Sequence, residues 1–246
     1  RKEIFWGREM FDDRVIVPSF DVAHVYTISG WGVDVGFEGG DDGGAYRWES
    51  PIQSDADIER LHWPAISVEE DATERVLALA RDLFDGVLDV RLRTKWWWSV
   101  GLTWNLAAWR GLQPLMYDMI DNPDVVHRLM TVLCDGTMAI LDSLEERGLL
   151  ASNNDGTYVG SGGFGWTTEL PDEGPDGRVH LEDMWGFAES QETVGISPDM
   201  FEEFIFPYQD KLLERFGLNC YGCCEPLDSR WHVVERLPRL RRVSLS

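Results

Sequence analysis

The chain has 246 residues, 43% of them hydrophobic, and a formal net charge of −22 at pH 7. This length is close to the roughly 250 residues of one (β/α)8 barrel, and the hydrophobic content is enough for a sizeable core. The strong negative charge argues against nucleic acid and anionic membrane surfaces as partners, because both would repel the protein.

The distribution of apolar residues and cysteines indicates where the protein resides. No run of about 18 apolar residues occurs, so we expect no transmembrane helix. The four cysteines are Cys134, Cys220, Cys223 and Cys224, and the last three fall within five positions. This spacing makes a poor disulfide framework and is typical of a reducing compartment, so we expect a cytoplasmic protein.

The first half of the chain predicts strands, a loop and a helix. An apolar run predicts a strand over residues 14–20, and the Gly- and Asp-rich residues 29–50 predict a loop. Ser67 and Glu70 form a capping-box pattern, which predicts a helix that ends near Phe84. Two further strands are expected, over residues 87–92 and 95–100.

From residue 122 onward, predicted helices and strands alternate. Asn122 and Pro123 favour a helix start and Gly148 favours its end, so we expect one long helix between them. The other expected elements are a loop over 156–179, strands over 149–153, 184–189, 218–221 and 242–246, and helices over 197–216 and 227–237.

Strands that are joined by helices run parallel, since each connection crosses over the sheet. The sequence therefore predicts an α/β protein, a (β/α)8 TIM barrel that forms a single domain over residues 1–246. We expect this barrel to be incomplete at both ends, because the chain lacks an initial Met and stops within a strand. A doubly wound sheet is the alternative, but the Gly-rich residues 160–165 are not followed by the helix that a phosphate turn needs.

Catalytic groups of parallel barrels follow the carboxyl ends of strands. Asn153, Asn154 and Asp155 follow one such strand, and their amides and carboxylate suit a heterocycle such as a pterin. The alternative is an ordinary turn, for which Asn-Asp-Gly is a common sequence. Glu189 follows another strand and is a candidate acid, base or ligand, the alternative being a solvated loop carboxylate.

The third strand end carries three cysteines. Cys220, Cys223 and Cys224 are candidate metal ligands, because thiolates bind Zn²⁺ tightly and Cys-x-x-Cys is a common ligand spacing. Glu225 follows them as a candidate oxygen ligand or catalytic carboxylate. The alternative is that these cysteines are small buried apolar residues. Upstream, Trp98 belongs to a dense aromatic region and is a candidate platform for a flat ligand, although packing explains most tryptophans there.

Several segments resemble the uroporphyrinogen decarboxylase-like superfamily over residues 95–246. The segment from Gly101 to Leu112, with Met116–Met119 and Asp121–Pro123 after it, looks like a helical segment of that family. The most specific match is Ser197-Pro198-Asp199-Met200-Phe201-Glu202-Glu203-Phe204-Ile205-Phe206-Pro207-Tyr208, which is similar to the helix before the metal-bearing strand. Residues 219–226 then fall at the family's His-x-Cys motif, with Tyr221 at the His position and Cys223 at the Cys position.

This resemblance implies a corrinoid-dependent methyltransferase. Such an enzyme moves a methyl group between a corrinoid, carried by a partner protein, and a small acceptor such as tetrahydrofolate or a thiol. A thiol acceptor would be activated by zinc. A pterin would be held by Asn153, Asn154 and Asp155 with its amine nitrogen near a carboxylic acid, so Asp155 is also a candidate catalytic residue beside Glu189 and Glu225. Trp98 and Tyr221 are further candidate substrate contacts.

Two alternatives remain open. The first is decarboxylation of a tetrapyrrole carboxylate, as in true uroporphyrinogen decarboxylases, although the Arg-rich motif of that branch is missing. The second is a degenerate barrel that only binds a corrinoid protein or a small ligand. The sequence leaves the methyl acceptor and the oligomeric state undecided.

Overall fold

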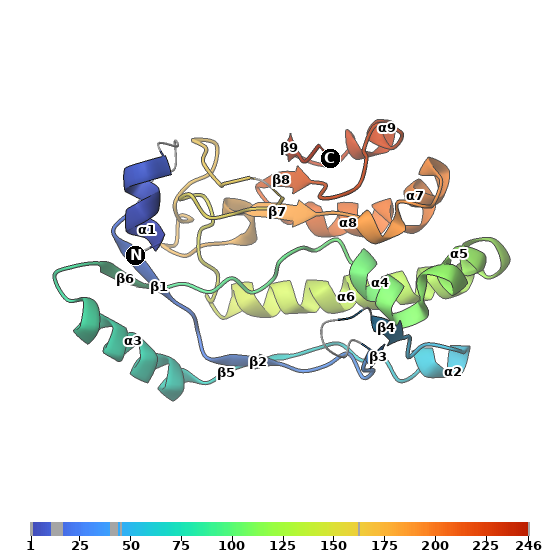
Figure 1. Cartoon of the computed structure of the whole chain (residues 1–246), viewed down its shortest axis with the longest axis horizontal. Helices are drawn as coiled ribbons and strands as arrows, with labels where there is room; N and C mark the ends of the chain where they lie inside the picture. The colour runs from blue at the N-terminus through green and yellow to red at the C-terminus, as the bar shows by residue number, and fades with distance from the viewer. Residues whose placement is uncertain (1, 11–16, 40–43, 45, 162, 246) are drawn as a thin grey trace. The chain divides into compact units, whose positions relative to one another are not determined.

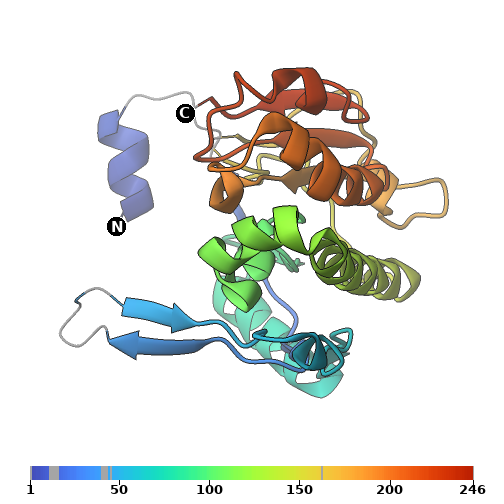
Figure 2. The ribbon, with the colours of Figure 1, turned by 90° about the vertical axis from the view of Figure 1, so that its right-hand side faces the viewer.

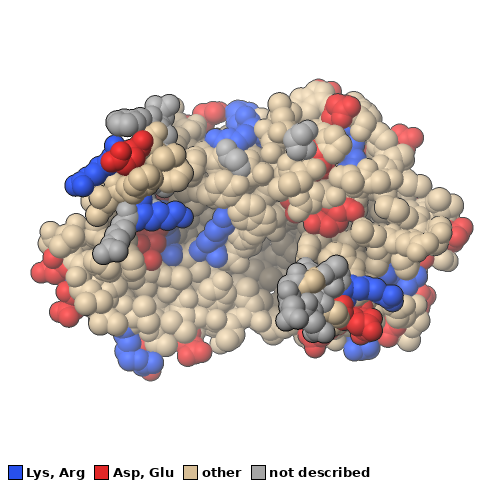
Figure 3. Space-filling model, viewed as in Figure 1, with Lys and Arg blue, Asp and Glu red and all other residues tan. Residues whose placement is uncertain are grey.

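The structure is a computed structural model that describes residues 2–10, 17–39, 44, 46–161 and 163–245 (Figure 1). The chain forms two compact units. The smaller unit comprises Arg1–Tyr26 and Val68–Lys95, and the larger unit comprises Thr27–Ser67 and Trp96–Ser246. On the face shown in Figure 3, acidic side chains are scattered rather than gathered in one patch.

The smaller unit is a strand–helix–strand arrangement. It begins with α1 (Lys2–Phe5) and the π-helix η1 (Trp6–Met10), and its two strands β1 (Ser19–Val22) and β6 (Asp89–Leu92) pair in parallel. The helix α3 (Glu70–Phe84) confirms the helix predicted there, and it packs Leu77 and Ala80 against Val22. Of the strand predicted over residues 14–20, positions 14–16 lie outside the described residues, and the strand itself begins at Ser19.

The larger unit opens with short elements. The strands β2 (Tyr26–Ile28) and β5 (Ile66–Val68) pair with each other, and α2 (Asp55–Ile58) lies between them in sequence. Figure 2 shows β3 (Gly36–Gly39) and β4 (Tyr46–Glu49) as an antiparallel ribbon. The loop predicted over residues 29–50 was therefore wrong for residues 36–39 and 46–49, whereas residues 29–35, 44 and 50 form no helix or strand, as predicted, and positions 40–43 and 45 lie outside the described residues.

A group of helices forms the core of the larger unit. These are α4 (Thr103–Arg110), α5 (Leu112–Asp121), α6 (Pro123–Glu146), α7 (Pro198–Phe204) and α8 (Phe206–Leu213). The helix α6 confirms the long helix predicted after Asn122, and Figure 1 shows it as one continuous rod near β7 and α8. Its buried residues include Val126, Leu129, Met130, Leu133, Leu141 and Leu144. Among the described residues, no helix is both long and apolar enough to cross a membrane.

A three-stranded parallel sheet lies beside these helices. Its strands follow the order β7 (Trp185–Ala188), β8 (Leu218–Tyr221) and β9 (Leu240–Val243). The strand β8 has the predicted bounds. The short elements η3 (Leu181–Asp183), η4 (Gln191–Thr193) and α9 (Trp231–Val234) complete this region, and α9 is much shorter than the helix predicted over 227–237.

The predicted (β/α)8 TIM barrel was wrong, because the described residues form only short strands in sheets of two or three. The strands expected over residues 95–100 and 149–153 do not form. Both segments instead form isolated hydrogen bonds with the outer edge of β7. The Asn153 amide bonds the backbone N–H and carbonyl of Trp185, each at 2.9 Å, and the Val100 N–H bonds the Phe187 carbonyl at 2.9 Å. The Asn153 side chain thus bonds the backbone groups of Trp185 that a neighbouring strand would use.

The helix predicted over residues 197–216 is divided in two. The helix α7 ends at Phe204 and α8 begins at Phe206, with Pro207 in its first turn. Proline has no backbone N–H and its ring clashes with the carbonyl four residues earlier, so it favours a helix start over a helix interior. Ser197 caps α7 as the sequence suggests, since its hydroxyl accepts a hydrogen bond from the Met200 N–H at 3.1 Å.

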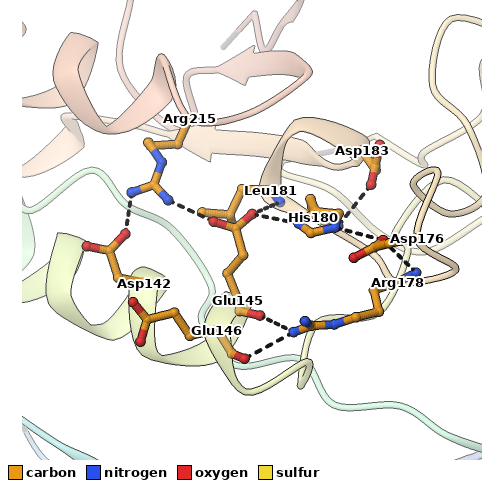
Figure 4. A network of polar contacts seen from close by, with 9 residues as sticks. All are labelled: Asp142, Glu145, Glu146, Asp176, Arg178, His180, Leu181, Asp183 and Arg215. Atoms are coloured by element: carbon orange, nitrogen blue, oxygen red, sulfur yellow. Dashed lines mark hydrogen bonds and ion pairs between the residues drawn. The ribbon is translucent and has the colours of Figure 1, made fainter.

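The long loop before β7 is fixed to the end of α6 by a charged network (Figure 4). The Arg178 guanidinium donates hydrogen bonds to the carbonyls of Glu145 and Glu146, at 2.6 and 3.1 Å. The imidazole of His180 lies 3.0 Å from Asp176 Oδ1 and 3.6 Å from Glu145 Oε1. The Arg178 hydrogen bonds satisfy carbonyls at the end of α6, where a helix leaves its last carbonyls without intrahelical partners.

Candidate active site at the ends of β7 and β8

The residue after β7, Glu189, lies at the wall of a pocket of about 230 Å³. The described residues that line it are Trp98, Ser99, Leu102, Trp104, Asn105 and Glu189. Both tryptophans are about half exposed, and Trp98 stacks on Tyr158 with ring centroids 5.4 Å apart. Pockets for drug-sized ligands begin at roughly 300 Å³, so this one suits a ring system or a smaller group.

The carboxyl group of Glu189 is buried, with 5% of the residue exposed. Burial, together with the nearby charge of Glu192 and a smaller contribution from Glu225, raises its pKa to about 7. The Gln191 N–H, at 3.3 Å, and the Ser99 hydroxyl act in the opposite direction. A carboxyl group with this pKa is both a competent acid and a competent base at neutral pH.

The approach of the chain to Glu189 requires glycine at position 101. A Cβ atom on Gly101 would lie 2.3 Å from the Glu189 carbonyl oxygen and 2.9 Å from its Oε1. The next residue, Leu102, has a φ of 69°, in the left-handed region that leucine rarely adopts. Such a backbone conformation costs about 1–3 kcal/mol and is typical of functional sites. Leu102 both begins α4 and lines the pocket.

A buried amide from α8 fixes this arrangement. Gln209, which is fully buried, donates hydrogen bonds from Nε2 to the carbonyls of Gly101 at 2.6 Å and Glu189 at 2.9 Å. Its Oε1 accepts a hydrogen bond from the Tyr221 hydroxyl at 2.8 Å. Burial raises the pKa of Tyr221 far above its usual value, so this hydroxyl stays protonated and acts as a donor.

Behind the pocket, Glu225 connects the segments that follow β7 and β8. Its Oε1 accepts a hydrogen bond from the Ser190 N–H and its Oε2 from the Cys223 N–H, both at 2.8 Å. The buried Arg230 donates to Ser190 Oγ at 3.1 Å and to the Thr193 carbonyl. Glu225 and Tyr221 thus contact buried protein groups around Glu189, and neither is among the described residues that line the pocket.

The three candidate metal ligands after β8 have different surroundings. Cys220 is fully buried, and burial raises the pKa of its thiol to about 11. Cys223 is partly exposed and Cys224 is exposed, with their sulfur atoms 3.6 Å apart. Among the described residues, no group of three or more His, Cys, Asp or Glu side chains is arranged to hold a metal ion. Zinc binding by these cysteines therefore stays a prediction.

The candidate pterin ligands serve the packing of the long loop. Asn153 bonds the backbone of Trp185, and Asn154 accepts from the Trp185 indole at 3.1 Å and donates to the Thr167 carbonyl at 2.8 Å. Asp155 accepts a hydrogen bond from the Thr157 hydroxyl at 2.9 Å. None of the three is among the described residues that line the Glu189 pocket.

The structure thus brings two of the sequence-predicted residues, Glu189 and Trp98, to one pocket. Sequence reasoning missed Gly101, Leu102 and Gln209 as parts of it. A signal for Gln209 does exist, since it is a polar residue on the helical face that also carries the apolar residues three and four positions later, Leu212 and Leu213. Comparison of the chain with protein-family models and with curated proteins finds no match to either.

Proposed function

We propose that this protein is a methyltransferase that moves a methyl group between a corrinoid, carried by a partner protein, and a small acceptor in the Glu189 pocket. The observation that carries the proposal is a buried carboxyl group with a pKa of about 7 at the wall of a pocket flanked by two tryptophans. This combination suits a flat nitrogen heterocycle, whose ring stacks on an indole and whose amine exchanges a proton with a carboxyl group.

The resemblance to the uroporphyrinogen decarboxylase-like superfamily gives a second support. Gly101, Leu102, Trp104 and Asn105 all belong to the resembling segment 101–112, and all lie at Glu189. The segment 197–208 immediately precedes Gln209, whose amide holds the Glu189 and Gly101 carbonyls. Of the segments on which the resemblance rests, 101–112 therefore contributes lining residues to the pocket, and 197–208 leads into the residue whose amide holds the pocket's backbone.

Among the possible acceptors, we favour a reduced pterin such as tetrahydrofolate over a thiol. Methyl transfer to an amine forms an N–C bond and releases the amine proton. Glu189 in its carboxylate form takes up this proton, and in the reverse direction its acid form returns it. Asn105 provides an amide for the polar edge of the ring, and Trp98 or Trp104 provides a stacking surface. The corrinoid supplies or receives the methyl group.

Decarboxylation of a tetrapyrrole carboxylate has less support. Its polyanionic substrate calls for cationic side chains, and the described lining of the pocket includes no arginine or lysine. Arg230 lies nearby but is buried, and its guanidinium bonds Ser190 and backbone carbonyls.

The experiment is a comparison of substrates with the purified full chain. Methylcobalamin is mixed with tetrahydrofolate or with a thiol, and loss of the Co–C absorbance is followed. We expect methyl transfer to tetrahydrofolate, with at least a tenfold decrease for Glu189→Gln. Loss of CO₂ from uroporphyrinogen without methyl transfer would replace the proposal with the decarboxylase. Inactivity in both assays, with tight binding of a corrinoid protein, would indicate a binding module.

A further inference from the structure

Cys223 and Cys224 are neighbours in sequence whose side chains converge. Their sulfur atoms are 3.6 Å apart, although adjacent side chains in extended backbone point to opposite sides. The preceding Gly222 has a φ of 94°, which turns the chain out of β8. The Glu225 carboxylate then holds the Cys223 N–H at 2.8 Å, so the backbone of the pair is fixed at one end.

The pair also differs from the other cysteines in accessibility. Cys224 is exposed and Cys223 is partly exposed, whereas Cys134 and Cys220 are buried. Burial raises the pKa of the Cys134 and Cys220 thiols to about 11 and also raises the pKa of the Cys223 thiol, which disfavours the reactive thiolate form of these three residues. The Ser161 hydroxyl, from the loop before β7, hydrogen-bonds the Cys223 thiol. A reagent in solution therefore reacts with Cys224 first. The Cys223 sulfur then lies close enough to attack the Cys224 sulfur.

We propose that Cys223 and Cys224 are a redox modification site, which forms a reversible disulfide between neighbouring residues by exchange with a small-molecule disulfide. The Cys224 thiolate attacks the reagent disulfide, breaks its S–S bond and releases one thiol, which leaves a mixed disulfide on Cys224. The Cys223 thiolate then attacks the Cys224 sulfur and releases the second thiol. Two protein thiols are oxidised, one disulfide is reduced, and the released thiols take up both protons.

Geometry also predicts that this disulfide is easily reduced. Adjacent Cα atoms are about 3.8 Å apart, below the roughly 4.4–6.8 Å that unstrained disulfides span. Strained and exposed disulfides are the reducible and regulatory ones. Oxidation would also remove the Cys223 thiol proton and with it the free thiol that Ser161 contacts.

The test uses oxidised glutathione on the full chain, followed by alkylation with N-ethylmaleimide and mass spectrometry. We expect two fewer alkylated cysteines and a loss of two hydrogen atoms in the tryptic peptide that ends at Arg230. Fragmentation should place the bond between Cys223 and Cys224, and dithiothreitol should restore both thiols. Phenylarsine oxide, which bridges close thiols, should bind once per chain and protect the same two residues.

Two variants make the outcome decisive. In Cys223→Ser the exchange should stop at a stable glutathione adduct on Cys224, because the second thiol is missing. Cys220→Ala removes the third cysteine of that peptide and should leave the oxidation unchanged. Persistent alkylation of both thiols, stable glutathione adducts on the unsubstituted chain, or a bond from Cys220 would each overturn the proposal. These readouts are masses, so they are independent of the methyl-transfer proposal.

Discussion

Gly101 and Glu189 lie so close that a single added methyl group at position 101 would meet the Glu189 carbonyl oxygen at 2.3 Å. The contact joins the start of α4 to the end of β7, and the amide of Gln209 bonds both carbonyls. The position of the Glu189 carboxyl group therefore depends on two residues that carry no chemistry themselves. The effect of packing at Gly101 can therefore be measured separately from the proton exchange of Glu189.

Gly101→Ala should displace the Glu189 backbone. Overpacking of this kind costs about 1–3 kcal/mol, so the free energy of unfolding measured in urea should fall by that amount. Gly30→Ala is the matched control, because a Cβ at Gly30 meets no atom within 4 Å. A control effect below about 0.5 kcal/mol is expected there. Equal effects for the two variants would show that the contact with Glu189 is not tight.

Glu189→Gln should change how stability depends on pH. The folded pKa of about 7 lies above the usual value of 4.5 for glutamate, so the folded state binds the proton more tightly than the unfolded state. The stabilisation of the folded state by protonated Glu189 is fully present below pH 4.5 and is lost as pH rises through about 7. The unsubstituted chain should lose roughly 3 kcal/mol over this interval relative to Glu189→Gln. Parallel stability curves would contradict the raised pKa.

The amide of Gln209 and the hydroxyl of Tyr221 should be energetically coupled. Gln209→Leu removes the amide donor that two buried carbonyls share, and Tyr221→Phe removes the hydroxyl that donates to the Gln209 amide oxygen. A double-mutant cycle in urea should give a coupling energy of about 1–2 kcal/mol, because the two groups share one network. Additive effects would indicate that the hydrogen bond between them contributes little.

His180 should make the loop before β7 sensitive to pH. The hydrogen bond with Asp176 raises the pKa of His180, and the charges of Asp176, Glu145 and Asp183 add to this effect. Arg215, which pairs with Glu145, and Arg178 are the cations of the same network. The stabilisation is therefore fully present below the unfolded pKa of about 6.5 and is lost as pH rises through the folded pKa.

Trypsin cleavage after Arg178 measures this effect. At pH 6 we expect faster cleavage in His180→Gln than in the unsubstituted chain, and at pH 8 the difference should narrow. Asp172→Asn removes a charge from the same loop without altering His180. The ratio of its cleavage rates at pH 6 and pH 8 should equal that of the unsubstituted chain. A constant difference between pH 6 and pH 8 would exclude protonation of His180 as the cause.

The sequence predicts local structure here better than the assembly of that structure. Helix signals around Asn122 and Pro123 and the apolar strand Leu218–Tyr221 depend on neighbouring residues, and both are confirmed. The predicted barrel was wrong because two strands pair only where the edge of the partner strand is open to hydrogen bonding. No local pattern shows that the Asn153 amide would occupy the edge of β7.

The candidate site was predictable in part for the same reason. Glu189 stands out because it follows an apolar strand. Its raised pKa, however, depends on burial and on Glu192 and Glu225, and its position depends on Gly101 and Gln209. Apart from Glu192, these residues lie 20 or more positions from Glu189 in sequence, so the pattern around Glu189 alone does not reveal the contacts.

The proposed function depends on a proton that Glu189 exchanges near neutral pH. Infrared difference spectra between the unsubstituted chain and Glu189→Gln, recorded as a function of pH, isolate the carbonyl band of this one protonated carboxyl group. We predict a band that disappears with a midpoint near pH 7. A midpoint near 4.5, the usual pKa of glutamate, or no band assignable to Glu189 above that pH, would contradict this role of Glu189.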